Sequence, residues 1–231
     1  MMIILWILGF LLVMIIIYMI SNKVKINIKS FFKKGFLSKN NEYGLYCFVG
    51  KQGKGKTYSA IKYLEEQSGD RVILTNVYSY YYNVKDRKDI FYLENISDLI
   101  KKAIFLQKQD KKVIVFFDEI FTILEKKQAV NKDILSFISQ LRKREIIFIT
   151  TAQEWLEINI TFRRYCRYNI NCNNVNFFVT IFFNQIGDAE NMVFNKDLMD
   201  WESPIIQTNI FKSNLNISKL YDTLETIKVS S

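Results

Sequence analysis

Short apolar runs separated by polar segments dominate the chain after residue 42. The runs lie at residues 43–49, 71–76, 113–120 and 145–153. Nearly continuous apolar runs of this length are typical of strands that are buried on both faces of a parallel sheet. Apolar residues at helical spacing follow the first run, over residues 57–67 with a stop at Ser68-Gly69, and precede the fourth, over residues 131–143. The pattern predicts an α/β domain over residues 42–231 with a mostly parallel central sheet.

Two further apolar segments follow the fourth run. They occupy residues 167–172 and 175–183 and are separated by Asn173-Asn174. Asparagine pairs favour turns, so these segments predict two paired strands that extend the sheet. The second segment has only nine residues, which is too short for a helix that crosses a bilayer.

The start of the chain has a different pattern, because residues 2–20 contain no charged side chain. As a helix this segment is about 28 Å long and spans a hydrocarbon core. A cleaved signal peptide would need positive charge before the apolar run and small residues after it, and neither is present. A buried core helix is the other alternative. Lysines follow the run and none precedes it, which predicts a single transmembrane anchor over residues 1–21 with the rest of the chain in the cytosol.

Most of the net positive charge lies directly after this run. The chain carries +9 overall, and residues 21–40 supply six lysines and no acid, whereas the rest has 26 bases against 23 acids. Residues 22–41 therefore form a basic juxtamembrane linker that lies along an anionic membrane surface or is simply solvated. The nearly neutral domain gives no argument from charge for nucleic-acid binding. Three widely spaced cysteines without any histidine argue against a zinc site and are typical of buried, reduced thiols.

The sequence GKQGKGKT at residues 50–57 lies between the first predicted strand and the first predicted helix. It matches the phosphate-binding loop pattern G-x-x-x-x-G-K-T, in which backbone N–H groups surround phosphate oxygens. Lys56 would reach the β and γ phosphates of ATP, and Thr57 would bind Mg²⁺. The predicted nucleotide-binding residues are Gly50, Lys51, Gln52, Gly53, Lys54, Gly55, Lys56, Thr57 and Tyr58. The alternative is a lysine-rich loop that matches by chance.

A second acidic motif, VIVFFDEI at residues 113–120, ends the third predicted strand. Asp118 is expected to orient Mg²⁺ and Glu119 to polarise the attacking water. The alternative is a buried strand that ends in a solvated acidic turn. The fourth strand ends at Gln153, which we expect to sense the γ phosphate, with Thr151 as the second candidate and a turn-capping role for Gln153 as the alternative.

These motifs resemble the FtsK–HerA superfamily of P-loop ATPases, and within it the zonular-occludens-toxin-like phage assembly proteins and the DNA-packaging ATPases of membrane-containing viruses. The resemblance covers residues 43–168 and rests also on ISQLRKREIIFITTAQEW and FRRYCR within that range. It implies a RecA-like sheet in which the strand that ends at Gln153 lies between the other two motif strands. It also implies a homo-oligomeric ring in which an arginine of the neighbouring subunit completes each site. Arg163 and Arg164 are the first candidates for that arginine, and Arg142 and Arg144 the next.

The resemblance implies a membrane-anchored ATPase that uses ATP and Mg²⁺ to move DNA during genome packaging or virion assembly and extrusion. The expected location is the cytoplasmic membrane of the host cell, or the virion membrane, with virion or assembly-complex proteins as further partners. The span precedes the ATPase domain here, whereas zonular-occludens-toxin-like proteins generally carry it afterwards. A conjugative DNA-coupling ATPase and a membrane-tethered nucleotide switch or scaffold are the alternatives. The tyrosine-rich stretch YSYYYN at residues 78–83 either stacks on unpaired bases or packs in the protein.

Overall fold

The computed structural model describes residues 43–120, 131–176 and 178–221, together with residues 6, 9, 10, 13, 14 and 17. The predicted membrane anchor and basic linker, residues 1–41, therefore lie almost entirely outside the described residues. Within the part that is described, no helix is both long enough and apolar enough to cross a bilayer.

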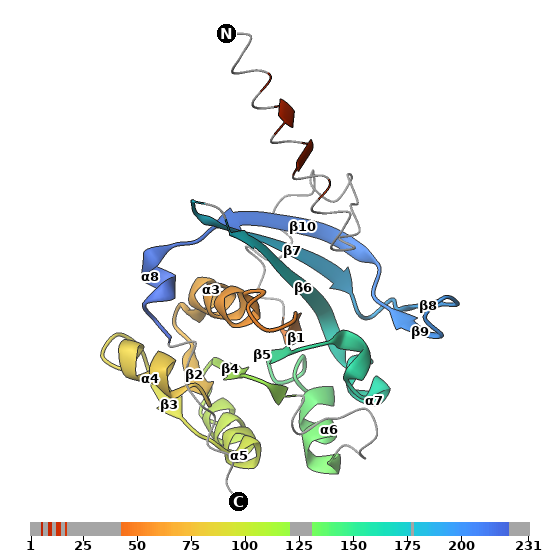
Figure 1. Ribbon diagram of the computed structural model, residues 1–231. Helices are drawn as coiled ribbons and strands as arrows, with labels where there is room; N and C mark the ends of the chain where they lie inside the picture. The colour runs from red at the N-terminus through yellow and green to blue at the C-terminus, as the bar shows by residue number, and fades with distance from the viewer. Residues whose placement is uncertain are drawn as a thin grey trace, which may run out of the picture.

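An eight-stranded sheet forms the centre of the molecule (Figure 1). Its strands are β1 (Gly44–Val49), β2 (Val72–Thr75), β3 (Ile90–Tyr92), β4 (Val113–Phe117), β5 (Ile146–Ala152), β6 (Cys166–Asn176), β7 (Thr180–Asp188) and β10 (Ile205–Lys212). The order across the sheet is β10-β7-β6-β1-β5-β4-β2-β3, and every neighbouring pair is parallel except β6–β7 and β7–β10. The predicted α/β class and mostly parallel sheet are thus confirmed, and β5 lies between β1 and β4 as the resemblance implied.

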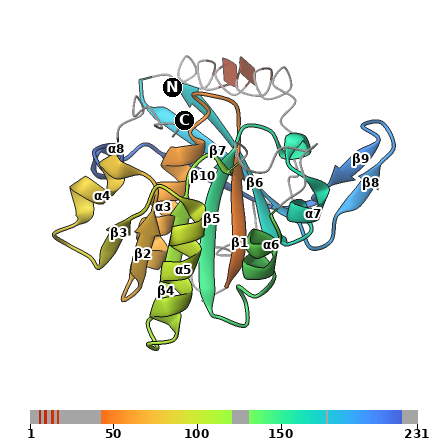
Figure 2. The same cartoon turned by 90° about the horizontal axis from the view of Figure 1, so that it is seen from below.

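Helices cover both faces of the parallel part of the sheet (Figure 2). On one face, α3 (Lys56–Ser68) and α4 (Tyr78–Val84) pack on side chains such as Tyr46 and Phe48. On the other face, α5 (Ile96–Gln107) and α6 (Lys132–Ser139) pack on the alternate positions, such as Leu45 and Cys47. Each buried strand therefore contributes to two apolar cores, which explains why its sequence is apolar throughout.

The helix boundaries follow local signals in the sequence. Gly69 ends α3 with a φ of 39°, which confirms the predicted stop. The side chain of Asn131 accepts a hydrogen bond from the backbone of Asp133 at the start of α6. The tyrosine-rich stretch forms α4, where Tyr80 is buried in the core and Tyr78 and Tyr82 are exposed.

The predicted turn at Asn173-Asn174 is wrong, because β6 continues through both residues to Asn176. Asn174 is paired with Phe182 of β7, and its side chain donates a hydrogen bond to the carbonyl of Gly53 at 2.8 Å. Contacts with another part of the chain thus keep these asparagines in a strand.

Several elements were not predicted from the sequence. Besides β3, α5 and β10, they are the short helices η2 (Trp155–Glu157), α7 (Ile160–Arg163) and α8 (Leu215–Ser218), and a separate hairpin of β8 (Val193–Asn195) and β9 (Asp200–Glu202). The β8–β9 hairpin projects beside the sheet next to the ends of β7 and β10 (Figure 1).

Cys47, Cys166 and Cys172 are buried, unpaired thiols, as expected. Burial raises the pKa of the Cys172 thiol to about 12, so it stays protonated near neutral pH.

Candidate active site

The glycine-rich loop connects the carboxyl end of β1 to the first turn of α3. Gly53 and Gly55 have φ angles of 76° and 79°, which side-chain-bearing residues rarely adopt. A Cβ atom on Gly55 would lie 2.3 Å from the ring of Phe182 on β7. The loop therefore needs glycine at this position for both its backbone angle and its contact with the sheet extension.

Four predicted residues converge where β1 and β4 end. Lys56 is only 8% exposed, and its Nζ lies 4.0 Å from Oε1 of Glu119. The hydroxyl of Thr57 lies 3.4 Å from each carboxylate oxygen of Asp118, although 61 residues separate the two in sequence. The fold thus brings a lysine, a hydroxyl and two carboxylates together at the amino end of a helix, which is a favourable place for phosphate.

Asp118 lies in a largely buried position between Thr57 and Thr151. Burial raises the pKa of its carboxyl to about 6, and the nearby charge of Glu119 acts in the same direction. The hydroxyl of Thr151, which donates to Oδ1 of Asp118, and the charge of Lys56 oppose that rise. A cation next to this carboxylate would favour its ionised form.

Glu119 follows Asp118 in a left-handed backbone conformation with a φ of 56°. A non-glycine residue in this region costs roughly 1–2 kcal/mol. The N–H of Glu119 donates to the hydroxyl of Thr151 at 2.8 Å, which helps to offset that cost. Thr151 on β5 therefore contacts both acidic residues and fixes the turn that positions them.

The sequence motifs did not identify Asn76 as a site residue, although it follows β2 at the same edge of the sheet. Its side chain accepts a hydrogen bond from the N–H of Asp118 at 2.8 Å and donates one to the carbonyl of Asp118 at 3.2 Å. The available signal was a polar residue at the carboxyl end of a strand next to β4, because such ends meet at one edge of a parallel sheet.

The other predicted loop residues are arranged differently. The side chain of Tyr58 stacks on Phe182, with ring centroids 4.3 Å apart, and its hydroxyl accepts from the N–H of Asn214 at 2.6 Å. Lys51 forms an exposed ion pair with Glu154 at 3.7 Å, and Gln52 is also exposed. These side chains lie against the protein or in solvent, so the backbone of the loop is the part suited to hold phosphates.

Gln153 follows β5 and is exposed. It lines a groove together with Gly50 and Lys51, beside the loop. Its assignment as the γ-phosphate sensor stays a prediction.

Comparison with known families identifies the domain. Residues 46–174, more than half of the chain, match the model of the ATPase family associated with various cellular activities (AAA). The chain belongs to the AAA family. The matched segment runs from β1 to β6 and so contains the loop, the acidic motif and β5. No curated protein matches this AAA chain significantly in sequence.

The solved structures that share the fold of this AAA protein include the following two. The N-terminal domain of zonular occludens toxin from Neisseria meningitidis is 13% identical, with a TM-score of 0.50, and the match covers 78% of the AAA chain and 100% of that domain. The genome packaging NTPase from Sulfolobus turreted icosahedral virus 2 in complex with ATP-gammaS is 14% identical, with a TM-score of 0.50, and the match covers 72% and 100% of the two chains. The resemblance stated from the motifs is thus confirmed as a resemblance of fold.

Arg163 of the AAA chain does not fit the role of an arginine offered to a neighbouring subunit. Its side chain is 1% exposed, and Nη2 lies 2.8 Å from Oδ1 of Asp200 while Nη1 donates to the carbonyl of Trp201 at 3.0 Å. Its guanidinium also lies over the ring of Trp155. We correct the expectation accordingly: Arg163 ties β9 to the domain, and the adjacent Arg164, which is exposed, remains the candidate.

All four candidate arginines lie at the edge of the sheet opposite the glycine-rich loop. Arg142 and Arg144 precede β5, and Arg163 and Arg164 precede β6, whereas the loop follows β1. Because these strands are parallel, the six residues of β1 separate the two edges by roughly 20 Å. None of the four belongs to the nucleotide site of its own chain.

The residues around Asp118 suit Mg²⁺. A threonine hydroxyl and a carboxylate supply the oxygen ligands that Mg²⁺ prefers, next to the loop that would hold the phosphates. Thr57 and Asp118 would hold the ion, and their assignment as its ligands stays a prediction.

Proposed function

We propose that this AAA chain is a membrane-anchored ATPase that moves the DNA of a phage or mobile element during packaging or virion assembly. The observation that carries the proposal is the convergence of Lys56, Thr57, Asp118 and Glu119 at one edge of the sheet. A passive nucleotide-binding domain has no need of a second acidic residue beside the metal ligand. The DNA substrate is supported by the fold shared with a genome packaging NTPase.

In the proposed reaction the loop backbone and Lys56 hold the β and γ phosphates of ATP. Bound Mg²⁺ would neutralise phosphate charge. Glu119, whose carboxylate lies 4.0 Å from Lys56, accepts a proton from the attacking water. Thr151 and Asn76 hold the turn that carries Asp118 and Glu119.

Each site is completed by a neighbouring subunit in a homo-oligomeric ring, with Arg164 as the arginine that stabilises charge on the γ phosphate. This part of the proposal is supported by the position of the candidate arginines at the edge opposite the loop. A ring with head-to-tail contacts brings opposite edges of two subunits together.

The membrane part of the proposal rests on the sequence. The uncharged residues 2–20 and the six lysines that follow them support a single span with the ATPase domain on the cytosolic side of the host membrane.

The test is the ATPase rate of the full chain, purified in detergent and shown to be oligomeric, with no DNA, single-stranded DNA or duplex DNA. We expect DNA to stimulate hydrolysis. Lys56→Ala should abolish nucleotide binding, and Glu119→Gln should keep it but slow hydrolysis by about 100-fold or more. Hydrolysis that neither DNA stimulates would contradict the motor and favour a tethered switch or scaffold.

A further inference from the structure

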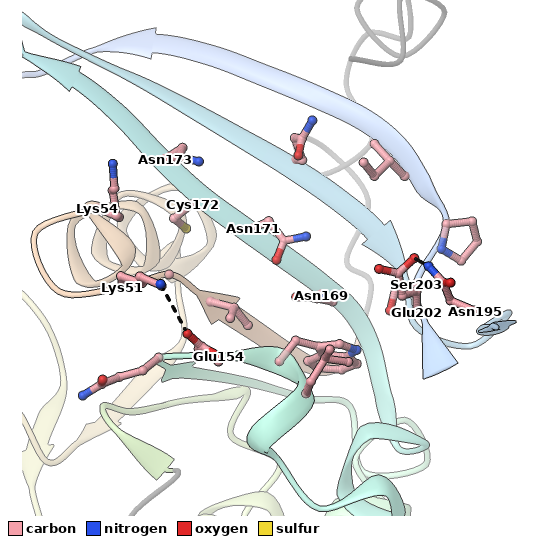
Figure 3. A pocket seen from close by; sticks show the side chains of 18 of the residues that line it. Lys51, Lys54, Glu154, Asn169, Asn171, Cys172, Asn173, Asn195, Glu202 and Ser203 are labelled. Carbon is pink, nitrogen blue, oxygen red and sulfur yellow. Dashed lines mark hydrogen bonds and ion pairs between the residues drawn. The ribbon is translucent and has the colours of Figure 1, made fainter. Parts of the chain in front are cut away.

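A polar groove of about 1050 Å³ lies beside the glycine-rich loop (Figure 3). Its floor is formed by β6 and β7. One wall carries Lys51, Lys54 and residues 153–156, and the β8–β9 hairpin forms the opposite wall. The described lining includes Lys51, Lys54 and Gln153 at the loop end but none of Lys56, Thr57, Asp118 and Glu119. The groove therefore begins at the glycine-rich loop and extends away from the predicted Mg²⁺ ligands.

The floor of the groove carries a row of amide side chains. Asn169, Asn171 and Asn173 occupy alternate positions of β6. Tyr168, Ile170 and Cys172 occupy the other positions and pack in the core on the α3 side. The asparagines therefore face away from α3 at intervals of roughly 6.6 Å. Gln185 is paired with Asn171 across the two strands and extends the row onto β7.

Some of these polar groups make no hydrogen bond among the described residues. Asn169 is only 3% exposed, and its Oδ1 and that of Asn173 are buried without a hydrogen-bond partner among the described residues. The hydroxyl of Ser203, in the facing wall, is buried in the same way. Burying such groups without a partner costs free energy. A groove built in this way is suited to a ligand that is rich in donors and acceptors.

The rim of the groove combines positive charge with an aromatic ring. Lys51 and Lys54 lie at the loop end and Lys196 at the hairpin end, next to Phe194, which is 42% exposed. The ion pair of Lys51 with Glu154 is largely exposed and therefore weak, so Lys51 can exchange that partner for a phosphate. Amides, lysines and an exposed aromatic ring together match bases and phosphates better than a peptide.

We propose that this groove binds a short stretch of single-stranded nucleic acid, with bases against the row of amides and phosphates at the rim lysines. The inference rests on the proposed function and adds the form of the DNA and its place. A duplex shows its base edges only at the bottom of its grooves, which a protruding helix or ribbon can reach and a concave surface cannot. Unpaired bases can turn outward and enter the groove.

The test measures binding of a labelled 12-nucleotide single strand to the full chain by fluorescence anisotropy. Two further probes are the duplex of the same sequence and an abasic strand with the same number of phosphates. We expect Asn171→Ala and Asn173→Ala each to weaken single-strand binding about 3–10-fold, as for the loss of one hydrogen bond. Lys196→Ala should reduce the slope of log affinity against log salt by about one.

Asn216→Ala, an exposed asparagine on α8, is the matched control and should bind like the unmodified chain. Unchanged unfolding midpoints will show that the groove variants fold.

The inference is overturned if folded Asn171→Ala and Asn173→Ala bind the single strand normally, or if the abasic strand binds as tightly as the intact one. It is also overturned if these variants lose affinity for ATP or for an extended peptide and not for the single strand. An unmodified chain that binds duplex better than single strand contradicts the inference alone. An unmodified chain that binds neither form contradicts the proposed function as well.

Discussion

Asn76 clamps the backbone of Asp118 through both its N–H and its carbonyl. In Asn76→Ala, the N–H of Asp118 loses its acceptor and the turn that carries Asp118 and Glu119 loosens. We expect the maximal ATPase rate to fall by about 10–100-fold, the usual cost of removing a group that orients a metal ligand. Steady-state rates at saturating ATP will measure this change.

Asn76→Asp keeps an acceptor for the N–H of Asp118 and should retain more activity than Asn76→Ala. Equal rates for Asn76→Ala and the unmodified chain would show that Thr151 alone holds the turn.

Asp118 also gives the protein a measurable dependence on pH when no metal is bound. Because burial raises its pKa to about 6, the folded state binds more protons than the unfolded state between about pH 4 and pH 6. This group's contribution to stability is present below that window and is lost as the pH rises through it. Urea unfolding in EDTA should therefore show that Asp118→Asn gains stability relative to the unmodified chain from pH 4 to pH 6. If the unfolding free energies of Asp118→Asn and the unmodified chain change in parallel from pH 4 to pH 6, the raised pKa of Asp118 is contradicted.

At the scale of elements, the β6–β7 pair supports the glycine-rich loop. Phe182 of β7 is stacked on Tyr58 and Phe211 and lies against Gly55. Phe182→Ala should lower the free energy of unfolding by about 3–5 kcal/mol and also weaken ATP binding, because the first turn of α3 loses its packing partner. Denaturant unfolding and titration with a fluorescent ATP analogue measure the two effects.

Phe178→Ala is the control for this variant, since Phe178 lies between β6 and β7 and is 92% exposed. It should change neither quantity. A loss of stability in Phe182→Ala with unchanged ATP affinity would show that the strands do not support the loop.

The sequence predicts the elements whose signals are local. The strands β1, β2, β4 and β5 are continuous apolar runs, and Gly69 and Asn131 are local helix signals. The prediction of a turn at Asn173-Asn174 is wrong, because a hydrogen bond from the side chain of Asn174 to the carbonyl of Gly53, 121 residues away, helps to keep Asn174 in a strand. Asn76 was missed for a similar reason, since its partner is a backbone group on another strand. The burial of Arg163 depends on Asp200, which also lies far along the chain.

At the scale of the whole molecule, the ring model makes a prediction about mixtures. Arg164→Ala and Glu119→Gln should each be nearly inactive alone. In an equimolar mixture that exchanges subunits, about a quarter of the interfaces combine an intact Glu119 with an intact Arg164 from the neighbour. ATPase activity should therefore reappear on mixing. Two inactive variants that stay inactive together, after subunit exchange is shown, would exclude Arg164 as the shared residue.

If a neighbouring subunit completes each site, as proposed, the distance between the glycine-rich loop and the arginine edge has a kinetic consequence. A chain that cannot complete its own site turns over ATP only after it meets another, so activity per chain should rise with concentration and vanish on dilution. Confinement of chains to a surface raises their effective concentration without any change in copy number. The local concentration of chains would then set the rate of ATP hydrolysis, and chains that are dispersed would hydrolyse little ATP.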